Sequence, residues 1–205
     1  MIVHISSGNS KLGKHIPNIS LPPGHTCVKG VPCAASACYA HKAWVQYPNV
    51  RKAWTENLIH FMMEPDNYFA DIQRYLWKHK PKRFRWHVAG DIPNQAYLNY
   101  MGVLARLNRL TNFLCFTKRY ELSYSKLPKN LSIVISAWPG YAIINVPWTA
   151  ECYTDPGGFL PIAWCQDGSE TRIPQNAIAC PGSCDACNLC WVLRGMGKHV
   201  WFHKH

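Results

Sequence analysis

Four cysteines near the C-terminal end of the chain have the residue type and the spacing of a metal centre. Three, two and two residues separate them in order, and they are Cys180, Cys184, Cys187 and Cys190. A Cys-x-x-Cys turn brings two thiolates to the same side of the backbone, so a compact run of cysteines can surround one centre. The intervening Pro181 and Gly182 favour the turn that this arrangement requires.

Zinc ions and iron–sulfur clusters both accept four thiolates, and the spacing of the cysteines distinguishes the two kinds of site. Zinc sites usually consist of two cysteine or histidine pairs joined by a long insertion, whereas compact runs are typical of [4Fe–4S] clusters. We therefore predict a [4Fe–4S] cluster at the C-terminal group, with zinc as the alternative metal.

A second cysteine group lies near the N-terminus. Five and four residues separate Cys27, Cys33 and Cys38. Three cysteines on a loop that leads into a helix can hold a cluster with one iron open to a cofactor or substrate. Alternatively, these thiols are structural, or they complete the coordination of one shared centre. The sequence thus predicts one or two clusters.

The remaining cysteines and the C-terminal histidines have less distinctive surroundings. Cys115, Cys152 and Cys165 are isolated among apolar or aromatic residues, which favours core packing. If the last residues form a strand, His199, His203 and His205 share one face. They could bind metal there or make ordinary hydrogen bonds.

Composition indicates a globular protein and a reducing compartment. The 205 residues are 48% hydrophobic and 16% charged, which fits a single domain over 1–205. We divide it into an N-terminal strand and cysteine loop (1–45), an α/β core (46–175) and a C-terminal segment with the cysteine cluster and a final strand (176–205). The first residues do not resemble a secretory signal, and no apolar run is long enough to span a bilayer. We expect a cytoplasmic protein with no membrane partner, in which ten cysteines indicate metal chemistry and not disulfides.

The formal charge of +11 suits a polyanionic partner such as nucleic acid. Metal-bound thiolates would lower the true charge. The basic residues are dispersed, and their only local concentration is Lys78, Lys80, Lys82, Arg83 and Arg85. Nucleic-acid binding is therefore a secondary hypothesis.

The elements that must position these cysteines alternate between strand and helix. Strands are predicted at 2–5, 83–88, 113–117 and 131–136, with later candidates at 158–164 and 200–203. Helices are predicted at 49–62, from Asp66 with Phe69, Ile72, Leu76 and Trp77 on one face, and after Asn94 with Tyr97, Met101, Leu104 and Leu107 on one face.

This alternation predicts an α/β fold with a parallel sheet, specifically a reduced or partial (β/α) barrel. The apolar run at 131–136 is typical of a strand that is buried on both faces. Right-handed crossovers place the loops after the strands on one edge of the sheet, where α/β folds bind their ligands.

Several motifs together resemble a known family. They are Cys38-Tyr-Ala40, Arg85-Trp-His-Val-Ala-Gly-Asp-Ile-Pro93, Phe116-Thr-Lys-Arg119, Ser136-Ala-Trp-Pro-Gly140, Cys180-Pro-Gly-Ser-Cys184 and Phe202-His-Lys-His205. The chain resembles the phage-encoded gene product 88-like proteins, whose cysteines are similar to those of iron–sulfur proteins related to radical S-adenosylmethionine enzymes. A phage origin would place the protein in the cytoplasm of the host cell.

The looser resemblance to radical S-adenosylmethionine enzymes implies roles for individual residues. A three-cysteine cluster there binds the methionine part of the cofactor, and a small acidic motif after the next strand contacts its amino group. Here Gly90 and Asp91 occupy the comparable place, and Lys118 and Arg119 would bind anionic groups. The gaps between the three cysteines are wider here than in those enzymes.

Three functions remain open. The first is a radical S-adenosylmethionine enzyme that acts on an unknown small-molecule or nucleic-acid substrate and receives electrons from a donor protein. The second is a non-catalytic iron–sulfur protein for electron transfer or structural support. The third is a zinc-stabilised nucleic-acid-binding protein.

Overall fold

One eight-stranded sheet organises the chain in the computed structural model, which describes residues 2–9, 12–31, 33, 38–137, 160–166 and 176–203. The strands, in sheet order, are β1 (Ile5–Ser6), β2 (Asn18–Ile19), β3 (Arg83–Trp86), β4 (Asn112–Thr117), β5 (Leu131–Ser136), β6 (Ile162–Gln166), β8 (His199–His203) and β7 (Ala177–Ala179). Only β1 and β2 pair antiparallel; the other neighbours are parallel.

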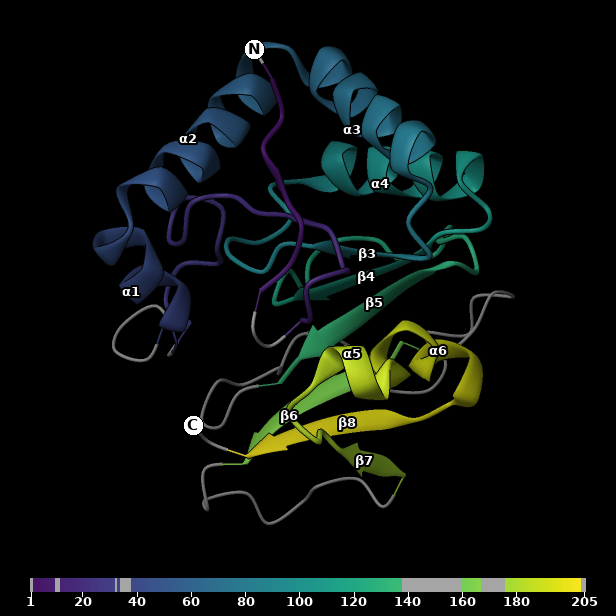
Figure 1. Cartoon of the computed structure of the whole chain (residues 1–205). Helices are drawn as coiled ribbons and strands as arrows, with labels where there is room; N and C mark the ends of the chain where they lie inside the picture. The colour runs from purple at the N-terminus through teal and green to yellow at the C-terminus, as the bar shows by residue number, and fades with distance from the viewer. Residues whose placement is uncertain are drawn as a thin grey trace.

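The sheet is open, because β1 and β7 form its two ends. From β2 to β6 the strands follow each other in chain order, as in a (β/α) barrel that does not close. The predicted fold class is therefore confirmed. Figure 1 shows α2, α3 and α4 beside the first half of the sheet and the short helices α5 and α6 beside the second half.

The helices are α1 (Tyr39–Gln46), α2 (Pro48–Met63), α3 (Pro65–His79), α4 (Gln95–Leu107), α5 (Cys184–Cys187), the 3-10 helix η3 (Leu189–Trp191) and α6 (Leu193–Met196). Prolines begin α2 and α3, where the missing N–H costs no hydrogen bond. Asn94 caps α4, since its side chain accepts a hydrogen bond from the Tyr97 amide at 2.9 Å, as the sequence predicted.

Successive side chains along β4 and β5 point to opposite faces of the sheet, and the core therefore forms two clusters. Phe113 and Ile133 pack with the helices α3 and α4, whereas Leu114 and Val134 pack on the opposite face with η3 and α6. We call this opposite face the inner face. Because β5 is buried from Leu131 to Ile135, its predicted burial on both sides is confirmed.

The sequence-based predictions differ from the structure in several places. The predicted strand at 2–5 is Ile5–Ser6, and β2 lies in a segment that was predicted to be a loop. Trp77 and Leu107 are 62% and 58% exposed, because each lies beside the buried stripe of its helix and not within it.

Candidate metal centres

The N-terminal cysteines lie where the polypeptide leaves the carboxyl end of β2. Cys27 follows this strand, and Cys38 is the N-cap residue of α1. Both are partly buried free thiols, as is Cys33. The amide N–H of Gly24 donates a hydrogen bond to the Cys27 sulfur at 3.4 Å, an interaction that stabilises negative charge on sulfur. A helix follows Cys38, as the sequence predicted, whereas residues 32 and 34–37 lie outside the described part of the chain.

The three thiols share one electrostatic neighbourhood with Asp91. Burial raises the pKa of Cys27, the Gly24 amide opposes this effect, and the charges of Asp91, Cys38 and Cys33 raise it further. Burial also raises the pKa of Cys33, and the nearby ammonium of Lys118 is the main opposing influence. None of the C-terminal cysteines is among the groups that shift these two thiols.

Gly90 allows the loop after β3 to pack closely against the loop that carries Cys27. It has a φ of +75°, and a Cβ atom there would lie 2.8 Å from the Thr26 hydroxyl and 2.9 Å from the Leu21 carbonyl oxygen. Only glycine combines this backbone conformation with so close an approach. The adjacent amide of Asp91 donates a hydrogen bond to the same Thr26 hydroxyl at 2.9 Å.

The Asp91 carboxylate joins the carboxyl ends of β3 and β4. It accepts hydrogen bonds from the Thr117 hydroxyl at 2.6 Å, the Lys118 amide at 2.9 Å and the Ile92 amide at 2.8 Å. Burial raises the pKa of Asp91, and these hydrogen bonds lower it. A carboxylate offers about four acceptor positions, so three protein donors leave room for one more. The predicted contact with a ligand ammonium stays a prediction.

Lys118 and Arg119 follow β4 at the same edge, but they have different surroundings. The charge of Lys118 lowers the pKa values of both Cys33 and Asp91. The Arg119 guanidinium donates to the Pro93 carbonyl at 2.7 Å and pairs with Glu121 at 2.8 Å. Lys118 thus acts electrostatically on the cysteine group, and the Arg119 guanidinium binds the loop after β3 and Glu121.

The C-terminal cysteines lie along a chain of short elements on the inner face. Cys180 follows β7, α5 runs from Cys184 to Cys187, and Cys190 belongs to η3. Asn188 separates the two helices with a left-handed conformation, φ 59°, which lets the chain reverse within one residue. The side chains of Cys180, Cys184 and Cys190 pack against the inner-face core.

These thiols also share one neighbourhood. Burial raises the pKa of Cys190 to about 12, and the guanidinium of Arg85 is the main opposing influence. The charges of Cys184, Cys180 and Cys187 raise it further. The four cysteines that the spacing grouped together are thus close enough in space to act on one another.

Two side-chain hydrogen bonds fix this segment to the sheet. The Ser132 hydroxyl of β5 donates to the Cys190 carbonyl at 3.0 Å, and the Trp191 indole donates to the Phe84 carbonyl of β3 at 3.4 Å. Sequence reasoning missed both contacts. In the sequence, Arg85 belongs to a basic run and to a family motif, and no periodic signal connects that residue with Cys190.

The other sequence candidates have ordinary roles or fall outside the described residues. Cys115 is fully buried in the core, as predicted. The His199 ring nitrogen accepts a hydrogen bond from the Ile162 amide at 3.0 Å, the ordinary role that the sequence left open. Cys152, His205 and the side chains of Cys165 and His203 lie outside the described part of the chain.

Within the described residues, no group of three or more His, Cys, Asp or Glu side chains has an arrangement that could hold a metal ion. The donor chemistry still fits an iron–sulfur centre, because each cysteine group offers free, partly buried thiols and has a cation in its electrostatic neighbourhood, Lys118 or Arg85.

In the described part of the chain, no helix combines the length and the apolar character that crossing a bilayer requires.

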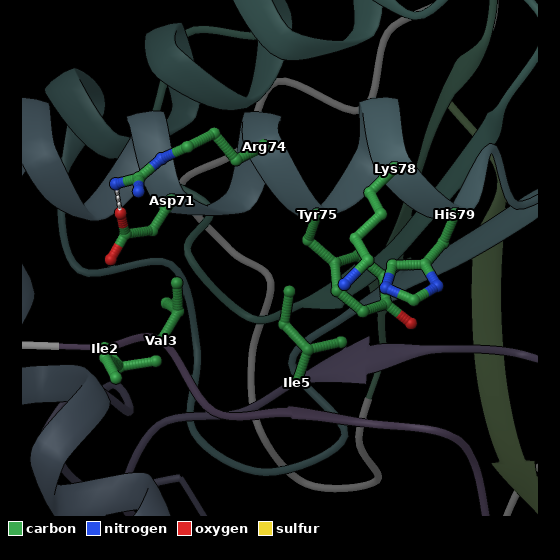
Figure 2. A pocket seen from close by; sticks show the side chains of 8 residues that line it. All are labelled: Ile2, Val3, Ile5, Asp71, Arg74, Tyr75, Lys78 and His79. Atoms are coloured by element: carbon green, nitrogen blue, oxygen red, sulfur yellow. Dashed lines mark hydrogen bonds and ion pairs between the residues drawn. The ribbon is translucent and has the colours of Figure 1, made fainter.

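A separate hollow of about 430 Å³ lies between the N-terminal residues and α3. Figure 2 shows Ile2, Val3 and Ile5 opposite Asp71, Arg74, Tyr75, Lys78 and His79, with Asp71 and Arg74 paired. It contains none of the predicted site residues.

Comparison with known proteins gives a family and nothing closer. No curated protein and no solved structure matches the chain. The family model described as gene product 88 matches residues 4–193. This span includes both cysteine groups and every strand of the sheet except β8. The chain therefore belongs to the gene product 88 family.

Proposed function

We propose that this protein is an iron–sulfur enzyme of the radical S-adenosylmethionine type. One [4Fe–4S] cluster would be bound by Cys27, Cys33 and Cys38, with one iron open to the cofactor. A second, supporting cluster would be bound by the four cysteines of the C-terminal group, which offer one thiolate for each iron.

The observation that carries the proposal is the composition of the carboxyl edge of the sheet. There the charges of Asp91, Cys38 and Cys33 raise the pKa of Cys27, and the Lys118 ammonium lowers the pKa values of Cys33 and Asp91. This edge is where parallel α/β sheets bind their ligands. A three-thiol donor set leaves a coordination position open, whereas a four-thiol set is saturated.

The residues of this edge would bind and orient the cofactor. Asp91 has about one acceptor position left for the cofactor ammonium. Lys118 would bind a carboxylate or another anionic group, because its charge already acts on Cys33. When bound, a reduced cluster would supply the electron that splits S-adenosylmethionine into methionine and a 5′-deoxyadenosyl radical.

The test is metal analysis of protein purified without oxygen, in the wild type and in two triple variants. Wild-type protein should contain about eight iron and eight sulfide per chain, if both groups hold a [4Fe–4S] cluster. Replacing Cys27, Cys33 and Cys38 by alanine should remove about half of the iron. Replacing Cys184, Cys187 and Cys190 by alanine should remove the other half. Cys115→Ala is the matched control and should keep all of it, because that thiol lies in the core.

The cofactor is tested on the same samples. Addition of S-adenosylmethionine to the reduced wild type should change its electron paramagnetic resonance spectrum and release 5′-deoxyadenosine. The N-terminal triple variant should do neither. A brown protein with an unchanged spectrum and no 5′-deoxyadenosine would refute the enzyme hypothesis and favour an iron–sulfur electron carrier. A colourless protein that contains zinc would refute both the enzyme hypothesis and the electron-carrier hypothesis.

A further inference from the structure

Arg85 is a cation on the inner face of the sheet with few protein partners. It lies on β3 between Phe84 and Trp86, which are both fully buried in the core on the helix side. Alternation along the strand therefore directs Arg85 to the inner face. There its guanidinium stacks over the ring of Phe116, with 4.2 Å between the guanidinium carbon and the ring centroid.

The charge of Arg85 lacks an anionic partner within the described part of the chain. Its Nε is buried and makes no hydrogen bond there, and none of the ion pairs among the described residues includes it. Arg85 is partly buried, and a charge that is partly withdrawn from water gains from a compensating charge close by. The stacking on Phe116 supplies only part of that compensation.

The C-terminal cysteine segment supplies a candidate for that anion. The Trp191 indole binds the carbonyl of Phe84, the residue directly before Arg85. Ser132 holds the Cys190 carbonyl from β5. Phe116, on which Arg85 stacks, belongs to the same packed cluster as Cys190. Contacts from β3, β4 and β5 thus hold the Cys190 segment on the same side of the sheet as the guanidinium.

We propose that Arg85 is the counter-cation of the metal centre bound by Cys180, Cys184, Cys187 and Cys190, and that it sets the reduction potential of that centre. The inference rests on the proposed iron–sulfur function. A [4Fe–4S] cluster with four thiolates is anionic and gains another negative charge on reduction. A fixed positive charge beside Cys190 therefore stabilises the reduced form more than the oxidised form, and raises the potential.

The experiment compares reduction potentials of the C-terminal cluster, measured by redox titration with electron paramagnetic resonance. The starting protein carries Cys27→Ala, Cys33→Ala and Cys38→Ala, so that only one cluster contributes to the signal. Arg85→Gln should shift the reduction equilibrium at least tenfold toward the oxidised form, which is about 59 mV for a one-electron couple. Arg85→Lys should keep most of the wild-type potential, because it keeps the charge.

Arg83→Gln is the matched control. Arg83 lies on the same strand and the same face, whereas the stacking contact with Phe116 belongs to Arg85. Its replacement should leave the potential unchanged. Metal-free Arg85→Gln should unfold at the same urea concentration as metal-free parent protein or a higher one, because the substitution removes an unpaired charge.

The outcomes separate this inference from the proposed function. A full iron and sulfide content with the same potential in Arg85→Gln and the parent would refute the role of Arg85 and leave the cluster intact. A loss of stability in the metal-free variant without a change in potential would show that Arg85 is structural only. Absence of iron and sulfide from the parent protein would refute the proposed function, and the role of Arg85 with it.

Discussion

The indole Nε1 of Trp191 donates a hydrogen bond to the carbonyl oxygen of Phe84 at 3.4 Å, although 107 positions separate the two residues in the chain. Both residues are buried. The contact joins the C-terminal cysteine segment to β3, and with it Cys190 to the strand that carries Arg85. Together with the Ser132 hydrogen bond to the Cys190 carbonyl, it links the compact cysteine run directly to the sheet.

Trp191→Phe tests this link. Phenylalanine fills much of the same space but cannot donate a hydrogen bond, so the Phe84 carbonyl loses a partner and a small void remains. We expect the free energy of unfolding in urea to fall by about 1–3 kcal/mol. Trp77→Phe is the control, because Trp77 is 62% exposed and its replacement should change stability by less than about 0.5 kcal/mol. Equal effects of the two substitutions would contradict the role of the Trp191 contact.

Gly90→Ala tests the close packing of the β3 loop on the Cys27 loop. The added Cβ would meet the Leu21 carbonyl and the Thr26 hydroxyl at less than 3 Å, so the loop must shift. Gly24→Ala separates this clash from backbone strain. Gly24 has a similar φ of +82°, and no atom lies within 4 Å of the position of its Cβ. Each variant should lose about 1–2 kcal/mol through its backbone conformation, and Gly90→Ala should lose more. Identical melting temperatures for the two variants would rule out the clash.

His87 should make the protein sensitive to acid. Burial, and secondarily Arg85, lower the pKa of His87 to about 3, and its ring nitrogens have no hydrogen-bond partner among the described residues. The folded state therefore favours the neutral ring. Its contribution to stability is complete above the ordinary pKa of 6.5 and is lost as the pH falls from there toward 3, by about 1.4 kcal/mol per pH unit.

The measurement is urea unfolding at several pH values between about 7 and 4.5, a window set by the ordinary histidine pKa. His87→Asn should flatten the fall in stability over this window, because asparagine does not titrate and tolerates the positive φ of 52° at this position. His41→Asn, on the exposed surface of α1, should leave the slope unchanged. The idea fails if the wild type and His87→Asn lose stability in parallel.

Thr117→Val tests whether the Asp91 carboxylate depends on β4. The hydroxyl of Thr117 donates to Asp91 at 2.6 Å and accepts from the Arg119 amide at 3.0 Å. Valine keeps the shape and removes both hydrogen bonds, which should cost about 1.5–3 kcal/mol because one of them reaches a carboxylate. Thr55→Val is the control, since that hydroxyl binds only the Arg51 carbonyl on an exposed helix surface. A loss at Thr117 no larger than that at Thr55 would count against this role.

Much of the fold could be predicted because its signals are local. The Asn94 cap and the proline near the start of α2 act within one turn of helix, and the buried run of β5 is visible in consecutive residues. Two-residue strands carry no such signal. β2 exists because Asn18 and Ile19 pair with β3, and neither composition nor periodicity distinguishes it from a loop.

The sequence alone determined the donor atoms of the candidate site. The spacing of Cys180, Cys184, Cys187 and Cys190 requires these thiols to be near one another, because turns of two or three residues cannot separate them far. It also identified Gly90 and Asp91 as a motif that follows a strand.

Only the tertiary structure decided what surrounds those atoms. The parallel order of β2, β3 and β4 brings Cys27, Asp91 and Lys118 to one edge, and the Trp191 contact brings Arg85 beside Cys190. The physical reason is that charge acts through space with a strength set by distance and burial. Strand pairing and core packing fix those distances between residues that the sequence keeps far apart.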